Sequence, residues 1–212
     1  MVSGPTRPPP GTRDPTHTED TMPSTFRIPA AAMTGPYAGI LKAYARRTWG
    51  DVPDTAYVVW HNRKVMRAVL GLERKVAGWD ALDPHLASFA QIASAAVIGC
   101  SWCMDFGYYL AHVEGLDEAK VREVPRWRES DVFTPLERDV LEYAEAMSAT
   151  PCAVEDDLSH RLQEALGLEA MVELTQLIAL ENMRSRFNSA AGLQSQGFSD
   201  VCELPLAVPS HA

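Results

Sequence analysis

The 212-residue sequence predicts an all-α fold, a single helical bundle with a disordered N-terminal tail. Strong helix formers dominate the composition, with 28 Ala, 19 Leu and 15 Glu. Residues that favour strands are sparse, since there are 5 Ile and the aromatic content is 8%. Apolar residues also recur at helical spacing along most of the chain, and we find no convincing strand.

The first 25 residues differ in composition from the rest. They contain six prolines and almost no large apolar residue. Such a segment cannot bury enough surface to offset the entropy lost on ordering, so we expect residues 1–25 to be disordered. Residues 26–212 contain no further low-complexity linker and no internal repeat, which predicts one domain over this range.

The first helices follow from apolar spacing and from start signals. A short helix is expected over residues 36–48 and a long one over residues 55–78, where the apolar residues form one stripe. Asp83 suits the N-cap and Pro84 the first helical position, so a third helix begins there. Gly99 interrupts this helix.

The second half of the domain predicts further helices. Thr134 and Glu137 have the spacing of a capping box, which marks the start of one helix. The other predicted elements are helices over residues 100–114, 155–166 and 169–192, a short helix capped by Asp117, and a connecting loop over residues 126–133.

Residues 84–104 carry no Asp, Glu, Lys or Arg, and these 21 residues would be enough to span a bilayer. Several polar residues and many alanines keep the segment too weakly hydrophobic for insertion, so we expect a buried helix and no membrane partner. The net charge of −9, without a basic patch, argues against nucleic acid. The N-terminus lacks the apolar run of a secretory signal, which predicts a reducing, cytoplasmic location.

The sequence Cys100-Ser101-Trp102-Cys103 is the sharpest chemical signal in the chain. Two cysteines three residues apart on a helical turn can form a disulfide, and the start of a helix stabilises a thiolate. A thiolate attacks peroxides and disulfides, and the second cysteine then resolves the intermediate. The alternative is that both cysteines are buried and pack as small hydrophobic residues.

The two remaining cysteines, Cys152 and Cys202, stand alone in the sequence. A zinc site would need two further ligands beside the CxxC pair, and the chain has no second CxxC or HxxxH motif. The sequence therefore predicts no metal and no cofactor.

An uncharged helix, the sequence Gly-Cys-x-x-Cys and a following helix together resemble the carboxymuconolactone decarboxylase-like family, which includes the alkyl hydroperoxidase D (AhpD) proteins. Residues 180–188 are similar to the closing helix of one branch of that family. The resemblance covers roughly residues 35–200. It implies an AhpD-like helical bundle that forms homo-oligomers, often trimers or hexamers. It also implies that Cys100 and Cys103 reduce peroxides or exchange electrons with a protein or low-molecular-weight thiol.

The chain departs from that family at two positions. The redox members carry a Glu twelve residues before the first Cys and a His four residues after the second. Here these positions hold Ser88 and Gly107, so both members of the proton relay are missing. The resemblance therefore implies weakened activity unless another polar group takes over.

Glu181 is the candidate to replace the missing carboxylate. It shares a helix face with Arg184 and Asn188, and a buried Glu beside a buried Arg requires pairing. The alternative is a purely structural ion pair that locks the core or a subunit interface. We take Cys100, Cys103 and Glu181 as the catalytic candidates.

Three other polar residues are candidates to replace the missing Glu and His. Asp105 is five residues after the first cysteine and is expected to be a solvated or capping carboxylate. His112 lies too far along the helix for direct contact with the cysteines and is expected to be a partly exposed surface residue. His61, on the long helix, could approach the cysteines from across the fold.

Three functions remain open from the sequence. The first is an AhpD-like thiol–disulfide oxidoreductase or peroxidase that acts on a small molecule such as a peroxide. The second is a non-catalytic or redox-sensing helical oligomer of the same family. The third, by family analogy alone, is a lyase that acts on a small organic acid.

Overall fold

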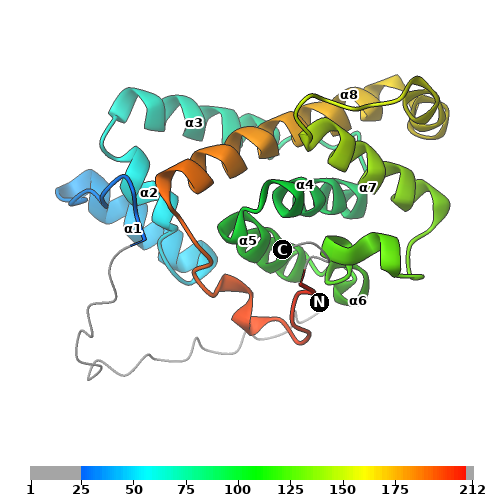
Figure 1. Ribbon diagram of the computed structural model, residues 1–212. Helices are drawn as coiled ribbons and strands as arrows, with labels where there is room; N and C mark the ends of the chain where they lie inside the picture. The colour runs from blue at the N-terminus through cyan, green and yellow to red at the C-terminus, as the bar shows by residue number, and fades with distance from the viewer. Residues whose placement is uncertain (1–24, 209–212) are drawn as a thin grey trace, which may run out of the picture.

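The computed structural model describes residues 25–208 and shows an all-α fold (Figure 1). Within this range there is no strand, so the predicted fold class is confirmed. The elements are α1 (Pro36–Trp49), α2 (Asp54–Val59), α3 (Arg63–Val76), α4 (Pro84–Ile98), α5 (Ser101–Val113), α6 (Glu118–Val121), the 3-10 helix η1 (Val124–Glu129), α7 (Pro135–Ser148), α8 (Asp156–Ala191) and the 3-10 helix η2 (Phe198–Val201). The predicted tail lies outside the described residues, apart from Thr25.

Helix α4 forms the centre of the bundle and packs against α5, α7 and α8. It begins as the sequence predicts, because the Asp83 carboxylate accepts hydrogen bonds from the first backbone N–H groups and Pro84 follows. Phe89 and Ala90 are completely buried. The uncharged segment is thus a core helix. No helix in the described part of the chain combines the length and the apolar character needed to cross a bilayer.

The capping box before α7 is confirmed. The Thr134 side chain accepts from the backbone N–H of Glu137, and the Glu137 carboxylate accepts in return from the backbone N–H of Thr134. The predicted break between residues 166 and 169 is also present, as a bend at Gly167, whose backbone is not helical (φ +78°, ψ 165°). A positive φ is easiest for glycine, so the bend lies where the sequence allows it.

Two predicted elements are wrong in detail. The single helix over residues 55–78 is two helices, because the Asn62 side chain accepts hydrogen bonds from the backbone N–H groups of Lys64 and Val65 and so starts a new helix, α3. The loop predicted over residues 126–133 begins as the 3-10 helix η1, which buries Trp127 in the main core.

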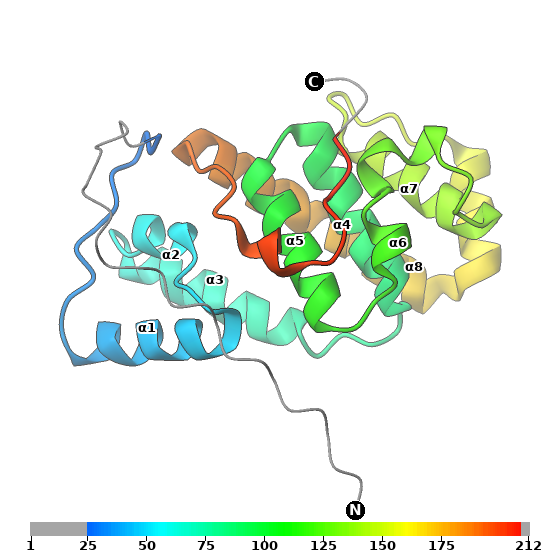
Figure 2. The same ribbon diagram turned by 90° about the horizontal axis from the view of Figure 1, so that it is seen from below.

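Helices α1 to α3 project to one side of the bundle (Figures 1 and 2). Helix α2 packs against α3, but the extensive helix packing lies within the bundle, where α4 contacts α5, α7 and α8. A charged contact ties the two parts together, because the Arg184 guanidinium on α8 binds the Glu73 carboxylate on α3 at 2.9 and 2.6 Å.

Candidate functional site

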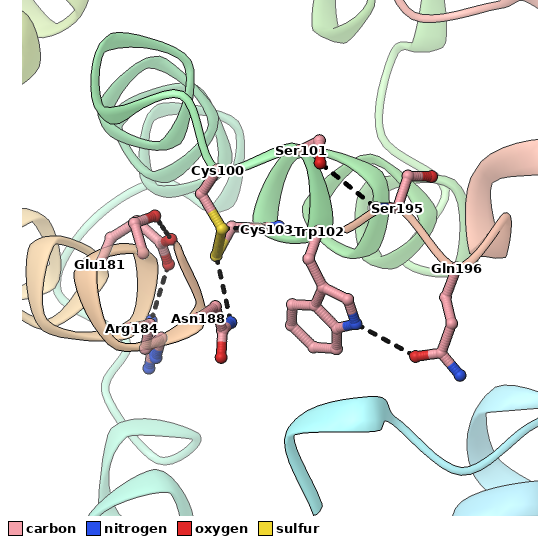
Figure 3. The surroundings of a disulfide bond; sticks show 10 residues. Cys100, Ser101, Trp102, Cys103, Glu181, Arg184, Asn188, Ser195 and Gln196 are labelled. Atoms are coloured by element: carbon pink, nitrogen blue, oxygen red, sulfur yellow. Dashed lines mark hydrogen bonds and ion pairs between the residues drawn. A yellow bond between two sulfur atoms is a disulfide. The ribbon is translucent and has the colours of Figure 1, made fainter. Parts of the chain in front are cut away.

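The Cys100–Cys103 disulfide lies at the N-terminal end of α5, and the predicted pairing is present (Figure 3). Gly99 ends α4 with φ +78°, a conformation that glycine adopts without strain, and the chain turns there into α5. Cys100 is the N-cap residue, and its Sγ accepts a hydrogen bond of 3.2 Å from the backbone N–H of Cys103. The two Cα atoms are 5.3 Å apart, a usual separation for a disulfide.

Both cysteines are buried in the monomer, with 1% of Cys100 and 8% of Cys103 exposed. They belong to a small apolar cluster that also contains Val58 from α2 and Ala95 from α4. Cys103 is the more accessible of the two. Both residues are nonetheless buried, so a partner that reaches either sulfur requires the covering side chains to shift.

Asn188 of α8 faces the disulfide (Figure 3). Its Nδ2 donates a hydrogen bond of 3.4 Å to Cys103 Sγ, and the side chain is buried. Its Oδ1 is also buried and has no hydrogen-bond partner among the described residues. Such an acceptor is costly to leave without a partner, so this oxygen is a place where a thiol, a hydroperoxide or a water could donate a hydrogen bond. Asn188 lies on the helix face that the sequence predicts, which it shares with Glu181, but its contact with the Cys103 sulfur was not predicted.

Gln196 is a second residue that sequence reasoning missed. Its Oε1 accepts from Trp102 Nε1 at 3.1 Å and from the backbone N–H of Asp54 at 2.8 Å. Its Nε2 donates to the Val52 carbonyl at 3.0 Å. One side-chain amide thus fixes the tryptophan of the CxxC motif against the start of α2. No sequence pattern signals this contact, because it joins segments about 90 and 140 residues apart.

Glu181 lies on the same side of α8 as Asn188 and is turned toward the disulfide (Figure 3). The carboxylate is buried, accepts from the Ser185 hydroxyl at 2.7 Å and pairs with Arg184 at 3.4 Å. Burial raises the pKa of Glu181 to about 6, although Arg184 and Ser185 act in the opposite direction. The predicted ion pair is present.

The two positions of the missing relay are on α4 and α5. Ser88 is half-buried on α4. At Gly107, a Cβ atom would lie 3.3 Å from Cγ1 of Ile92, which is itself buried. A side chain at position 107 would therefore require Ile92 to shift by a few tenths of an ångström.

The hydrogen bonds of the other two candidates, Asp105 and His61, are with groups other than the cysteines. Asp105 is buried and accepts four hydrogen bonds from the segment that follows α8, through the backbone N–H groups of Gln196, Phe198 and Ser199 and the Ser199 hydroxyl. Burial alone would raise the pKa of Asp105, but these hydrogen bonds together hold it below its usual value. His61 bonds the Pro29 carbonyl.

The opposite end of α5 brings together three side chains that the sequence does not connect. His112 is partly exposed, as the sequence predicts, and its ring pairs with Glu118, a contact that the sequence does not signal. Cys202 lies beside this pair, and one ligand-type atom of each residue falls within 4.8 Å of the other two. Cys152 is exposed, and neither it nor Cys202 forms a disulfide.

Comparison with known proteins places this geometry in a family. The model of the carboxymuconolactone decarboxylase family matches residues 63–146, which include the α4–CxxC–α5 unit. The uncharacterized protein YnjA of Escherichia coli K12 is 36% identical over 159 residues, which are 75% of this chain and 81% of YnjA. The chain belongs to the carboxymuconolactone decarboxylase family.

Solved structures support the family fold. The AhpD core of a peroxidase-related protein from Ralstonia eutropha JMP134 is similar at a TM-score of 0.70 and 15% identity, over 84% of this chain and 98% of that one. The debrominase Bmp8, solved with 2,3,4-tribromopyrrole, is similar at 0.69 and 20%, over 78% and 88%. At these identities the likeness shows the fold alone, and one family fold carries differently named activities.

Proposed function

We propose that this carboxymuconolactone decarboxylase family member is a thiol–disulfide oxidoreductase that reduces peroxides with the Cys100–Cys103 pair. The observation that carries the proposal is the placement of the two sulfurs, each of which accepts a hydrogen bond at the N-terminal end of a helix. Those donors favour the thiolate form over the thiol at both positions.

The accessible sulfur of Cys103 is the one that meets the substrate. In the reduced protein its thiolate attacks a peroxide oxygen, the O–O bond breaks, and the alkoxide leaves as the alcohol after taking one proton. Cys103 is then a sulfenic acid. The Cys100 thiolate attacks its sulfur, hydroxide leaves as water with a second proton, and the disulfide forms. An external dithiol supplies two electrons and two protons to restore the reduced pair.

Reduction of the disulfide uses the helix terminus. When a reductant thiolate attacks Cys103 Sγ, Cys100 leaves as a thiolate into the field of the first turn of α5. There the Cys103 backbone N–H already donates to its sulfur. Low leaving-group pKa speeds exchange, so the N-cap position suits Cys100 for this step.

Glu181 serves as the proton acceptor in place of the missing relay. Its pKa of about 6 leaves the carboxylate mostly ionised at pH 7, and it faces the disulfide from α8. A base of this kind is active when deprotonated, so the rate should fall as the pH drops through 6. Glu181→Gln should remove this limb of the pH–rate profile, whereas a purely structural Glu181 would lower the rate equally at all pH values.

The decisive experiment is turnover of hydrogen peroxide and an organic hydroperoxide with a dithiol reductant. Wild type and Cys152→Ser should turn over alike, and Cys103→Ser should fall to background. Cys100→Ser should retain Cys103, and peroxide added without reductant should convert it to a sulfenic acid that no second cysteine resolves, visible by mass spectrometry. A wild type without turnover would reject the peroxidase proposal. If the disulfide still exchanged with the dithiol, a redox-sensing role would replace it.

We further propose that the protein is a homo-oligomer, a trimer or hexamer, in which α1 contributes to the contact. Three large residues recur on α1 at helical spacing and are exposed, namely Tyr37 (49%), Ile40 (66%) and Tyr44 (56%). An apolar stripe on a helix that packs so little against the bundle is suited to a second copy. Sedimentation should show an oligomer that Ile40→Glu weakens and that Arg47→Glu, on the same helix, does not.

A further inference from the structure

We propose that His112, Glu118 and Cys202, at the C-terminal end of α5, bind a zinc ion. Each residue comes from a different segment: the last turn of α5, the first residue of α6 and the residue after η2. Figure 2 shows the C-terminal segment, in red, running between α5 and α6. This cluster is at the opposite end of α5 from the disulfide, so the inference does not depend on the proposed oxidoreductase activity.

The three side chains offer the donor set that zinc takes in proteins: an imidazole nitrogen, a carboxylate oxygen and a thiolate sulfur. The three atoms already lie within 4.8 Å of one another. Zinc–ligand distances of about 2.0–2.3 Å place two tetrahedral ligands roughly 3.5 Å apart. Small side-chain rotations are therefore enough to reach coordination geometry, without movement of the backbone.

Surrounding hydrogen bonds hold the ligand-bearing segments in position. Glu118 uses one oxygen toward His112 and the other to accept the backbone N–H of Glu203 at 3.0 Å. The fully buried Tyr108 donates its hydroxyl to the Leu204 carbonyl at 2.8 Å. Ligands oriented by a second layer of hydrogen bonds are typical of metal sites.

A simple His112–Glu118 ion pair would account for two of the three residues and would leave Cys202 without a role. The local charge favours a cation, because Glu118 brings its carboxylate to the cluster and Asp200 lies two residues before Cys202 in the chain. A divalent ion would offset this negative charge and bind the thiolate.

Bound zinc would fasten the C-terminal segment to the bundle. Three protein ligands leave a fourth position for water or a small anion. Cys202 also lines a surface pocket of about 730 Å³ beside α5, together with Ser101 and Asp105. The primary effect is therefore stabilisation of residues 202–207 against α5 and α6.

The test titrates the full-length chain with Co²⁺, a coloured substitute for zinc, after oxidation has closed the Cys100–Cys103 disulfide. We expect one ion per chain, a visible absorption of tetrahedral Co²⁺ and a near-ultraviolet charge-transfer band from thiolate to metal. Added Zn²⁺ should abolish both. The band should persist in Cys152→Ser, the matched control, and disappear in Cys202→Ser. Absence of the band in wild type, or its presence in Cys202→Ser, would overturn the proposal.

Two further measurements keep the test valid if Cys202→Ser fails to fold. Glu118→Gln keeps the size of the side chain and should weaken Co²⁺ binding by at least about tenfold. Zn²⁺ should raise the Tm of wild type more than that of Glu118→Gln. Equal Co²⁺ affinity, or an equal Tm shift, in the two proteins would count against the site. Because Cys202 takes no part in the redox cycle, peroxide turnover in these variants reports separately on the proposed function.

Discussion

The two ends of α5 both hold a half-buried or buried sulfur, yet they are built in different ways. At the N-terminal end, Cys100 and Cys103 are neighbours on one helical turn, and local backbone geometry brings their sulfurs together. At the C-terminal end, Cys202 reaches His112 only because the chain returns across α5 after α8. The first group is a sequence motif, and the second exists only in the folded protein.

This difference indicates which of the two sites keeps its geometry when surrounding residues change. A motif held by one turn can keep its geometry whatever residues surround it, and here the cysteines pair although Ser88 and Gly107 stand where the resemblance implies a Glu and a His. A cluster held by tertiary contacts depends on every segment that positions it. We therefore expect changes at the N-terminal end to alter reactivity, and changes in the returning segment to alter stability and metal binding together.

The largest expected effect is a separation of the two ends by cysteine substitution. Cys103→Ser should lower dithiol-dependent peroxide turnover at least about 100-fold, because no sulfenic acid can form at the accessible position. Cys202→Ser should leave turnover unchanged. Steady-state kinetics on both variants, with circular dichroism to confirm folding, make the measurement. A loss of turnover in folded Cys202→Ser would mean that the two ends are coupled.

The next largest effect is expected at Asp105, which binds the returning segment midway along α5. Asp105→Ala leaves three backbone N–H groups without their acceptor and should cost about 3 kcal/mol of unfolding free energy. It should also weaken Co²⁺ binding at Cys202. Asp105→Asn, the matched variant, keeps the shape and part of the acceptor capacity and should lose less. Urea unfolding of the three proteins measures the cost, and equal stability would show that the segment is held by other contacts.

Asp105 also gives the pH dependence of this contact. Hydrogen bonds hold its folded pKa below the unfolded value of about 3.9, despite the opposing effect of burial. Its contribution to stability is therefore complete above about pH 4 and is lost as the pH falls through the folded pKa. Below about pH 4, wild type should lose stability more steeply with falling pH than Asp105→Ala does.

Much of the fold could be predicted because its signals are local. The caps at Asp83 and Thr134, the turn at Gly99 and the break near Gly167 are set by residues within one helical turn. The single helix predicted over residues 55–78 is wrong because two local signals conflict there. The apolar stripe continues through the whole range, whereas the side-chain cap at Asn62, a weaker signal, starts a new helix.

The candidate site was predicted in part. The cysteine pairing follows from spacing, and the face of α8 that carries Glu181 and Asn188 follows from helical periodicity. The role of Gln196 and the cluster at Cys202 could not be predicted. Both depend on how the segment after α8 crosses α5, and no local pattern encodes that path.

A smaller effect is expected from rebuilding the lost relay. Gly107→His alone should destabilise the protein by about 1–3 kcal/mol without a gain in rate, because Ile92 occupies the space for its Cβ. Gly107→His combined with Ile92→Ala opens that space and should raise turnover near pH 7 by about tenfold. This gain is smaller than the roughly 100-fold or more that a well-placed general base contributes. Ile92→Ala alone is the control and should not raise the rate. A faster Gly107→His single variant would show that Ile92 moves aside for the new side chain without the second substitution.

The smallest effects come from a matched pair of glycines that flank α5. Gly99 (φ +78°) precedes Cys100, and Gly115 (φ +73°) follows the helix. A Cβ at either position meets no atom within 4 Å, so each change to Ala should cost about 1 kcal/mol from backbone strain alone. The readouts should differ. Gly99→Ala should shift the dithiol–disulfide equilibrium against glutathione and leave Co²⁺ binding unchanged, whereas Gly115→Ala should weaken Co²⁺ binding and leave that equilibrium unchanged. If both variants shifted both readouts, α5 would transmit strain along its length, and its two ends could not be treated as independent sites.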